Sequence, residues 1–214
     1  EPANAIAGEE KSASFSIEVI GSLPLSYKWY STSSPSVVID SLSTLTINNL
    51  SMTQNRNSYF CIVSNKHGDT SSRKCTLSVY RKPIITTHPS DKISVKANSS
   101  CTLSVAATGD SISYLWIKNG SDTLPSKTSH VIFSSAKATD SGSYQCFVYN
   151  IFDTIPSTTS FLNVLIPPTF DTIPDSVVVF DGDTARIRIS VSGTPPFSYK
   201  WIKNDTDSVG SSTE

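Results

Sequence analysis

Charge of either sign is scarce in this 214-residue sequence. Lys and Arg number 17 and Asp and Glu number 18, so the formal net charge is -1, and charged residues make up only 16% of the chain, against a typical share of about 25%. Proteins that hold nucleic acid or an anionic membrane surface present a basic field. We therefore expect no nucleic-acid partner and no direct attachment to a membrane surface.

Long apolar runs are also missing. No run approaches the roughly 20 residues of a membrane helix, and the opening residues, EPANAIAGEE, have neither the basic region nor the apolar region of a secretory signal. We expect the chain to be a segment cut at both ends from a longer protein. Any membrane span or targeting signal would then lie outside it.

Clusters of residues that carry chemistry are rare. The three histidines, His67, His88 and His130, are scattered, no C-x-x-C pair occurs among the four cysteines, and no G-x-S-x-G elbow is present. The carboxylates of Asp181 and Asp183 lie between alternating apolar segments, which favours a turn over a calcium site. The sequence predicts no enzyme, no metal site and no cofactor.

An internal repeat organises the chain. The segment from Val19 to Trp29 recurs at the same length from Val191 to Trp201, and a looser copy with one residue inserted runs from Val105 to Trp116. Each copy is an alternating strand, a Gly or Pro turn and a second strand that ends on Trp. Three equivalent tryptophans mark three units, and we expect all three indoles to be packing residues.

The apolar pattern has the period of strands. Apolar residues alternate with polar ones in all three copies of the first strand: Phe15, Ile17 and Val19; Cys101, Leu103 and Val105; Ile187, Ile189 and Val191. No stretch has a convincing 3.6-residue period. Many short strands separated by turn residues predict an all-β sandwich.

One segment carries a family resemblance. The run Asp140–Cys146, DSGSYQC, resembles the D-x-G-x-Y-x-C motif in strand F of the immunoglobulin superfamily. Cys101 and Trp116 resemble that family's strand B cysteine and strand C tryptophan. The resemblance implies a disulfide between Cys101 and Cys146, shielded by Trp116. It also implies that the hydroxyl of Tyr144 folds back onto the chain.

The first unit matches the motif less completely. Tyr59 and Cys61 keep the end of strand F, but Asn55 and Asn57 stand where the motif has Asp and Gly, and Phe15 rather than Cys occupies the expected strand B position. The following residues, SNKHG, resemble the F–G hairpin of I-type immunoglobulin domains. They also resemble immunoglobulin-like modules of bacterial surface proteins.

We therefore predict tandem immunoglobulin-like β-sandwiches, two complete and one truncated. Unit 1 spans residues 1–80, lacks the strand B cysteine and is clipped at its start. Unit 2 spans residues 83–165 and has the complete Cys-Trp-Cys set, and unit 3 spans residues 167–214 and stops after strand C. Because the linkers are short and carry Pro83, Pro167 and Pro168, we expect an extended rod with limited bending.

The other two cysteines leave two registers open. If the F–G hairpin of unit 1 centres on Gly68, Cys61 and Cys75 pair directly and a disulfide can form; a tighter turn at Lys66 and His67 makes them diagonal neighbours, which are too far apart for a bond. Oxidising surroundings favour the disulfide, which we adopt as the prediction.

Four N-glycosylation sequons occur in the sequence. Their asparagines are Asn49, Asn98, Asn119 and Asn204. The last three fall in predicted turns or loop ends, where a glycan would not disturb the core, whereas Asn49 lies at the end of a strand. We expect glycans in a secreted eukaryotic protein and bare asparagines in a bacterial one.

The resemblance implies an extracellular or cell-surface location and a binding function. The first hypothesis is cell adhesion or recognition through protein partners on cell surfaces, homophilic or heterophilic. The alternatives are the ligand-binding ectodomain of a signalling receptor, including a receptor tyrosine kinase, and a structural spacer of a bacterial surface protein. An intracellular muscle-type filament is disfavoured, because the predicted disulfide of Cys101 and Cys146 does not suit a reducing compartment.

Overall fold

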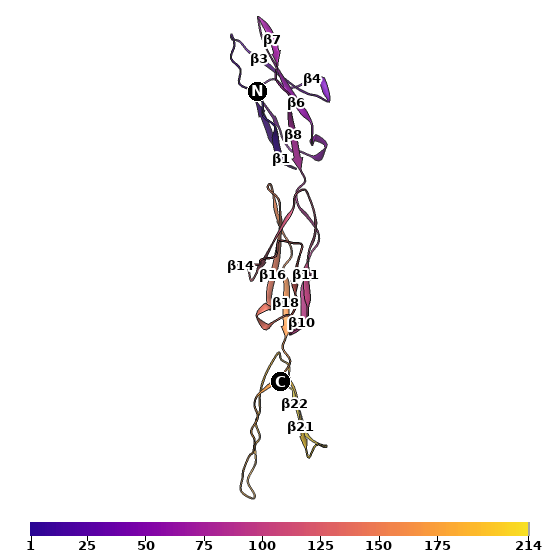
Figure 1. The fold of residues 1–214 in the computed structure, drawn as a ribbon, viewed down its shortest axis with the longest axis vertical. Helices are drawn as coiled ribbons and strands as arrows, with labels where there is room; N and C mark the ends of the chain where they lie inside the picture. Colours follow the sequence, from indigo (N-terminus) through magenta and orange to yellow (C-terminus); the bar gives the residue numbers. More distant parts are fainter. Residues whose placement is uncertain (214) are drawn as a thin grey trace.

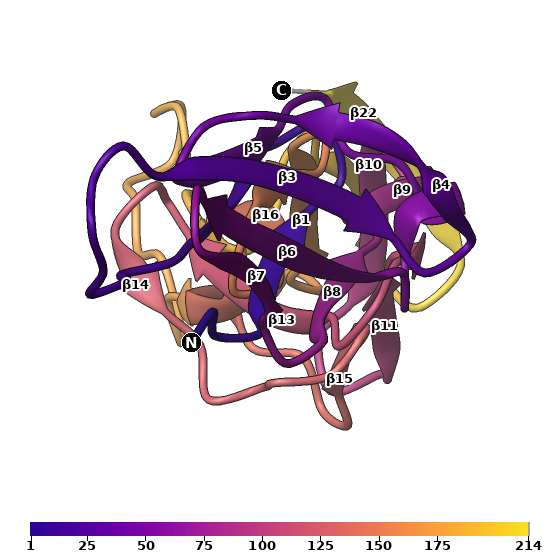
Figure 2. The ribbon, with the colours of Figure 1, turned by 90° about the horizontal axis from the view of Figure 1, so that it is seen from above.

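The computed structural model describes residues 1–213. The chain forms an extended rod in which three sets of strands follow one another end to end (Figure 1), with the first set in front when the rod is viewed along its axis (Figure 2). The only helical residues in the described part of the chain are two short 3-10 turns, η1 (Met52–Gln54) and η2 (Ala138–Asp140). The predicted all-β class is confirmed.

Unit 1 is a sandwich of two sheets. The larger sheet has the order β1-β8-β6-β3-β4, with β7 also paired to β6, and the smaller sheet consists of β2 and β5. The strands are β1 (Ala5–Gly8), β2 (Ala13–Ser16), β3 (Ser26–Ser31), β4 (Ser34–Asp40), β5 (Thr44–Ile47), β6 (Ser58–Asn65), β7 (Gly68–Ser71) and β8 (Cys75–Tyr80).

Unit 2 repeats this plan and adds a leading strand. The larger sheet has the order β10-β18-β16-β13-β14, with β17 also paired to β16, and the facing pairs are β11–β15 and β12–β9. The strands are β9 (Ile84–Thr87), β10 (Lys92–Lys96), β11 (Cys101–Ser104), β12 (Ala106–Thr108), β13 (Ser113–Lys118), β14 (Asp122–Thr123), β15 (His130–Phe133), β16 (Gly142–Tyr149), β17 (Thr154–Pro156) and β18 (Ser160–Leu165).

Unit 3 contains two strand pairs within the described residues. β19 (Thr169–Thr172) pairs with β20 (Ser190–Ser192), and β21 (Ser198–Lys203) pairs with β22 (Asp207–Thr213). Between β19 and β20 the chain makes a long excursion without strands. Its tip, at Gly182, is a turn in which Asp183 N–H donates to the carbonyl of Phe180, so the predicted turn at Asp181–Asp183 is confirmed.

The cores of units 1 and 2 are centred on tryptophan. Trp29 and Trp116 are completely buried, whereas Trp201 is half-buried. Each buried indole donates its Nε1–H to a loop carbonyl, that of Leu42 or that of Thr128, at 3.0 Å in both cases. The prediction that all three tryptophans are packing residues therefore holds fully for the first two.

The hydrogen bonds of the two sandwiches correct the predicted strand B position. Ile17 N–H donates to Ser43 O as Val105 N–H donates to Ser129 O, so these two residues are equivalent. Counting back along each strand makes Phe15 the equivalent of Leu103 and Ala13 the equivalent of Cys101. The residue that replaces cysteine in unit 1 is thus Ala13, which is buried.

A serine fixes how the last strand meets strand F. Ser72 accepts the N–H of Cys61 on its Oγ and donates its own N–H to the carbonyl of Cys61, at 2.9 and 2.8 Å. Ser157 and Cys146 make the same pair of bonds in unit 2, at 2.9 and 2.7 Å. The serine side chain thus takes the place of a backbone partner, and the strand divides there into β7 and β8, or β17 and β18.

We predict that tryptophan truncation has unequal costs. Trp116→Ala removes a fully buried indole, and we expect the free energy of unfolding of unit 2 to fall by about 3–5 kcal/mol. Trp201→Ala, at a half-buried position, should lower the stability of unit 3 by clearly less. Urea denaturation combined with hydrogen exchange resolved by unit measures both effects, and equal losses would contradict this account of the cores.

Candidate functional site

The four sequon asparagines share one backbone conformation. Asn49, Asn98, Asn119 and Asn204 all have positive φ, between 50° and 65°. Asparagine tolerates this left-handed region far better than most residues do. Each of the four therefore has a structural reason to be asparagine, independent of any glycan.

All four asparagine side chains are exposed to solvent. Asn119 uses its Oδ1 to accept the N–H of Ser143 at 3.0 Å, and the only side-chain contact recorded for Asn98 in the described part of the chain is also through Oδ1, to the hydroxyl of Ser135 at 3.5 Å. Because a glycan is attached to the amide nitrogen, the turn contacts and a glycan are compatible at both positions.

Cys101 and Cys146 lie on opposite sheets of unit 2. Cys146, on β16, is fully buried and lies directly across from Trp116 on β13, and Cys101, on β11, packs against the same core. The structure has all four cysteines as free thiols, so the disulfide between Cys101 and Cys146 stays a prediction. The two cysteines lie on different sheets of the sandwich and pack against the same core.

Cys61 and Cys75 occupy the register that does not favour a bond. β6 ends at Asn65 and β7 begins at Gly68, so the turn lies at Lys66 and His67, and Cys75 pairs with Tyr59 rather than with Cys61. The direct register on which we based a disulfide between Cys61 and Cys75 is therefore wrong. The physical reason is the tight turn together with the Ser72 bulge, neither of which cysteine spacing reveals.

Both thiols of unit 1 make local contacts instead. Cys75 Sγ–H donates to the carbonyl of Tyr59 at 3.3 Å, and Cys61 Sγ–H donates to that of Ile62 at 3.7 Å. Burial raises the pKa of each thiol. They behave as small buried core residues, which are unreactive near neutral pH.

The tyrosine of the strand F motif has the predicted role. The hydroxyl of Tyr144 donates to the carbonyl of Asp140 at 2.5 Å, which folds the side chain back onto the start of β16. Burial, and then the nearby carboxylate of Asp140, raise the pKa of Tyr144 to about 12. Burial likewise raises the pKa of Cys146 to about 11.

Unit 1 carries an apolar row on the outer face of its larger sheet. Val38 on β4, Tyr30 on β3 and Phe60 on β6 lie side by side in register, and the rings of Tyr30 and Phe60 stack with centroids 5.4 Å apart. β4 is the edge of this sheet, and Val37, Val38 and Ile39 on it are exposed. The sequence signal we missed is the unbroken apolar run Tyr59–Val63, which leaves both faces of the strand apolar.

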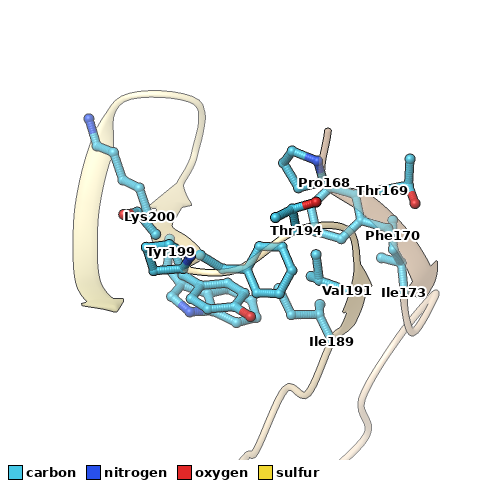
Figure 3. A pocket seen from close by; sticks show the side chains of 13 residues that line it. Pro168, Thr169, Phe170, Ile173, Ile189, Val191, Thr194, Tyr199 and Lys200 are labelled. Carbon is cyan, nitrogen blue, oxygen red and sulfur yellow. The ribbon is translucent and has the colours of Figure 1, made fainter. Parts of the chain in front are cut away.

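A hollow lies on the open inner face of unit 3. A cavity of about 690 Å³ is lined by Phe170, Ile173, Ile189, Val191 and Trp201, among others, and its apolar side chains converge in Figure 3. Ile189 corresponds to residues that are buried in units 1 and 2, and strands β6 and β16 cover the same face there. The hollow is thus the inner face of a sandwich rather than a ligand pocket.

No groups suited to a metal ion gather within residues 1–213: no three of the His, Cys, Asp and Glu side chains converge there. Over the same residues, no helix has the length and apolarity needed to span a membrane. His67 lies in the F–G turn, as predicted, where its N–H donates to Oδ1 of Asn65.

Comparison with known proteins agrees with this geometry. The model of the immunoglobulin domain matches residues 82–150, and the model of the immunoglobulin I-set domain matches residues 168–213. The human leucine-rich repeats and immunoglobulin-like domains protein 1 is 30% identical over 158 residues, which are 69% of this chain and 14% of that protein. The chain thus spans a small part of this relative.

Two solved structures share the fold. The I-band fragment I67–I69 of titin has a TM-score of 0.71 at 21% identity, covering 99% of this chain and 80% of that one. Dpr2 Ig1–Ig2 in complex with DIP-Theta Ig1–Ig3 has a TM-score of 0.58 at 20% identity, covering 96% and 78%. The chain belongs to the immunoglobulin superfamily and is a tandem array of its domains.

We predict that reduced unit 2 loses stability in alkali. In the unfolded chain the cysteine thiol and the tyrosine phenol have pKa values of about 8.5 and 10. In the folded unit the pKa of Cys146 is about 11 and that of Tyr144 is about 12. The folded state then binds more protons, so the free energy of unfolding is fully present below about pH 8.5 and falls as the pH rises towards 12.

Urea denaturation across this pH range, in a reductant that remains active in alkali, measures the effect. Tyr144→Phe should remove the upper part of the decline. Oxidation that joins Cys101 to Cys146 should remove the lower part, and non-reducing peptide mapping identifies that bond. A flat profile for the reduced protein would contradict the burial of these groups.

We also predict glycans on Asn98 and Asn119 when the chain is secreted from eukaryotic cells. Ser100→Ala and Ser121→Ala destroy the two sequons and keep the asparagines that the turns need. Each change should remove one enzyme-releasable glycan mass while the protein stays folded. An unglycosylated parent chain would refute the prediction.

Proposed function

We propose that this segment is a protein-binding part of an extracellular adhesion or recognition protein. The observation that carries the proposal is the rod itself: its units stand end to end with only residues 81–83 and 166–168 between consecutive strands (Figure 1). A stiff array holds binding faces away from the surface that anchors it. Domains of this family are typically binding modules without catalytic activity.

Contacts across the first junction support stiffness. The rings of Tyr80 and Phe152 lie 5.7 Å apart between units 1 and 2, and Lys82 Nζ lies 2.7 Å from Oε1 of Glu10. The ion pair is exposed, so solvent and salt screen it, whereas the aromatic contact restrains the junction through apolar packing. A spacer needs the same stiffness, which keeps a purely structural role as the second candidate.

The units carry the other parts of the proposal. We infer domains at residues 1–80, 83–165 and 167–214, an inter-sheet disulfide of Cys101 with Cys146, and glycans on the exposed turns. A disulfide and glycans together belong to the oxidising space outside the cell.

We propose the outer face of unit 1 as a contact face. Its stacked aromatic rings are of residue types that are enriched in protein interfaces, and its edge strand exposes Val37, Val38 and Ile39. The complex of Dpr2 with DIP-Theta, which shares this fold, makes another immunoglobulin-like protein, or a second copy of this chain, the partner class that we favour.

Beads coated with the segment test the function. We expect them to aggregate, or to attach to cells of the source organism, although the free monomer binds weakly, because many tethered copies act together. Val38→Lys adds a charge to the proposed face and should reduce attachment at least tenfold. Ile132→Lys, at an exposed strand position in unit 2, is the matched control and should attach normally.

Circular dichroism of each variant guards against loss of folding. If folded, coated beads neither aggregate nor attach to cells, the adhesion proposal fails and the spacer role replaces it. Normal attachment by Val38→Lys would leave adhesion standing and remove the outer face of unit 1 from it.

A further inference from the structure

The turn that follows strand C bears a sequon in unit 2 and none in unit 1. In unit 2, the N–H of Asn119 donates to the carbonyl of Ser143 at 2.8 Å. In unit 1, the N–H of Thr32 donates to the carbonyl of Ser58, also at 2.8 Å. Asn119 and Thr32 are therefore equivalent, and each stands three residues after its buried tryptophan. This bond allows the two larger sheets to be compared position by position.

In unit 2, the row that begins at Asn119 crosses the larger sheet to an exposed aromatic ring. Ser143 pairs with Phe161 on β18, and the side chain of Phe161 is 56% exposed. In unit 1, Ser58 pairs with Thr76 instead, and the hydroxyls of these two residues bond to each other at 3.2 Å. The sequon and the exposed ring thus occur together in unit 2, and the same row of unit 1 has neither.

Phe161 lies on the outer face of the sheet. Its neighbours Ser160 and Leu162 are buried, so strand alternation turns the Phe161 ring away from the core. Adjacent strands lie about 4.8 Å apart, and two such steps place about 10 Å between the ends of the row. An asparagine side chain and one sugar ring together span this distance. The small side chain of Ser143 leaves the space between them open.

The side chain of Asn119 is held against the sheet at the start of this row. Its Oδ1 accepts the N–H of Ser143 at 3.0 Å. A Cβ on Gly142 would lie 2.5 Å from the same oxygen, so the close approach of the carboxamide to β16 requires glycine there. The amide nitrogen, to which a glycan is attached, belongs to this fixed carboxamide. A glycan on Asn119 therefore starts beside β16.

A shallow hollow adjoins the row on the outer face. Its volume is about 140 Å³, and its lining includes Gly120, Ser143, Gln145 and Thr159, with Ile117 and Phe147 as apolar members. Gln145 Nε2–H donates to the carbonyl of Ser157 at 2.8 Å, which fixes the amide and leaves its oxygen as an acceptor. A sugar ring has apolar faces and polar edges, and a lining of both kinds matches it.

We propose that the outer face of unit 2 is a cradle for the glycan on Asn119. The first N-acetylglucosamine lies over Ser143, packs one face of its ring on Phe161, and turns its polar groups to Gln145 and Thr159. The glycan thereby covers the outer face of unit 2, whereas the outer face of unit 1 stays open. The inference rests on the glycan that we predict on Asn119 and is independent of any binding partner.

Oxidation by hydroxyl radicals measures which side chains the glycan covers. In the full chain secreted from eukaryotic cells, we expect Phe161 and Phe147 to be oxidised roughly threefold more slowly than in Ser121→Ala, because the sugar shields the aromatic rings. Ser121→Thr keeps the sequon and should keep the protection. Phe180, which is exposed in unit 3, is the reference and should react equally in all three chains. Equal oxidation of Phe161 with and without the glycan, or a bare Asn119 in the parent chain, would overturn the cradle.

Trimming separates a seated first sugar from a glycan that only sweeps past the sheet. Enzymatic trimming that leaves a single N-acetylglucosamine on Asn119 should keep most of the protection of Phe161. A rise in oxidation to the rate in Ser121→Ala would show that the outer sugars provide the protection, and the proposed seat of the first sugar would be wrong.

A double-mutant cycle tests whether the sugar and the ring stabilise each other. Ser121→Ala should lower the urea midpoint of unit 2 in the parent chain and leave it unchanged in Phe161→Ala, because groups in contact are coupled and separate groups are additive. Ser100→Ala, which removes the glycan of Asn98, is the matched control and should have the same effect with and without Phe161. Additive effects of Ser121→Ala and Phe161→Ala would contradict the contact, whatever the bead assays give.

Discussion

The burial of one indole side chain organises each closed sandwich. Trp29 and Trp116 are fully enclosed between two sheets, and each satisfies its N–H on a loop carbonyl. A buried side chain of this size stabilises the fold through the large apolar area it removes from water. The single hydrogen bond also ties the loop that crosses the end of the sandwich. In unit 3 the half-buried Trp201 borders an open hollow, so the same residue marks a sandwich whose inner face is uncovered.

Several turn residues both fix the backbone of their turn and have a second role, as sequon asparagines or as contacts to a linker. Sequon asparagines occupy left-handed positions that favour asparagine for backbone reasons, and the same loops are exposed and able to bear glycans. Glycine and a small polar residue after strand B serve the turn within one unit and also hold the linker from the unit before. Turn chemistry and junction chemistry therefore share a few residues, which is why a short linker can fix the arrangement of neighbouring units.

In the function that we propose, the junctions between units provide stiffness and the outer face of unit 1 provides the binding surface. The junctions limit bending. At the first one, the side chains of Asp110 and Asn150 form hydrogen bonds with the backbone N–H and carbonyl of the linker residue Arg81. The exposed row on unit 1 offers apolar and aromatic surface on a rigid sheet, and rigid surfaces lose little conformational entropy when they bind. Stiffness and binding are in this way properties of different residues.

The sequence alone determined the class of fold, the repeat and the buried tryptophans, because alternation, turn residues and motif spacing are local. It also determined the corner formed by Tyr144 and the turn at Asp181–Asp183. The tertiary structure alone decided the register of Cys75, which depends on where Ser72 enters the sheet. It showed that Ala13 rather than Phe15 is the equivalent of Cys101, because the position along the strand must be counted from its hydrogen bonds. The hydrogen bonds of Arg81 with Asp110 and Asn150 join residues that are 29 and 69 positions apart in the sequence. No local pattern encodes a contact over such a separation.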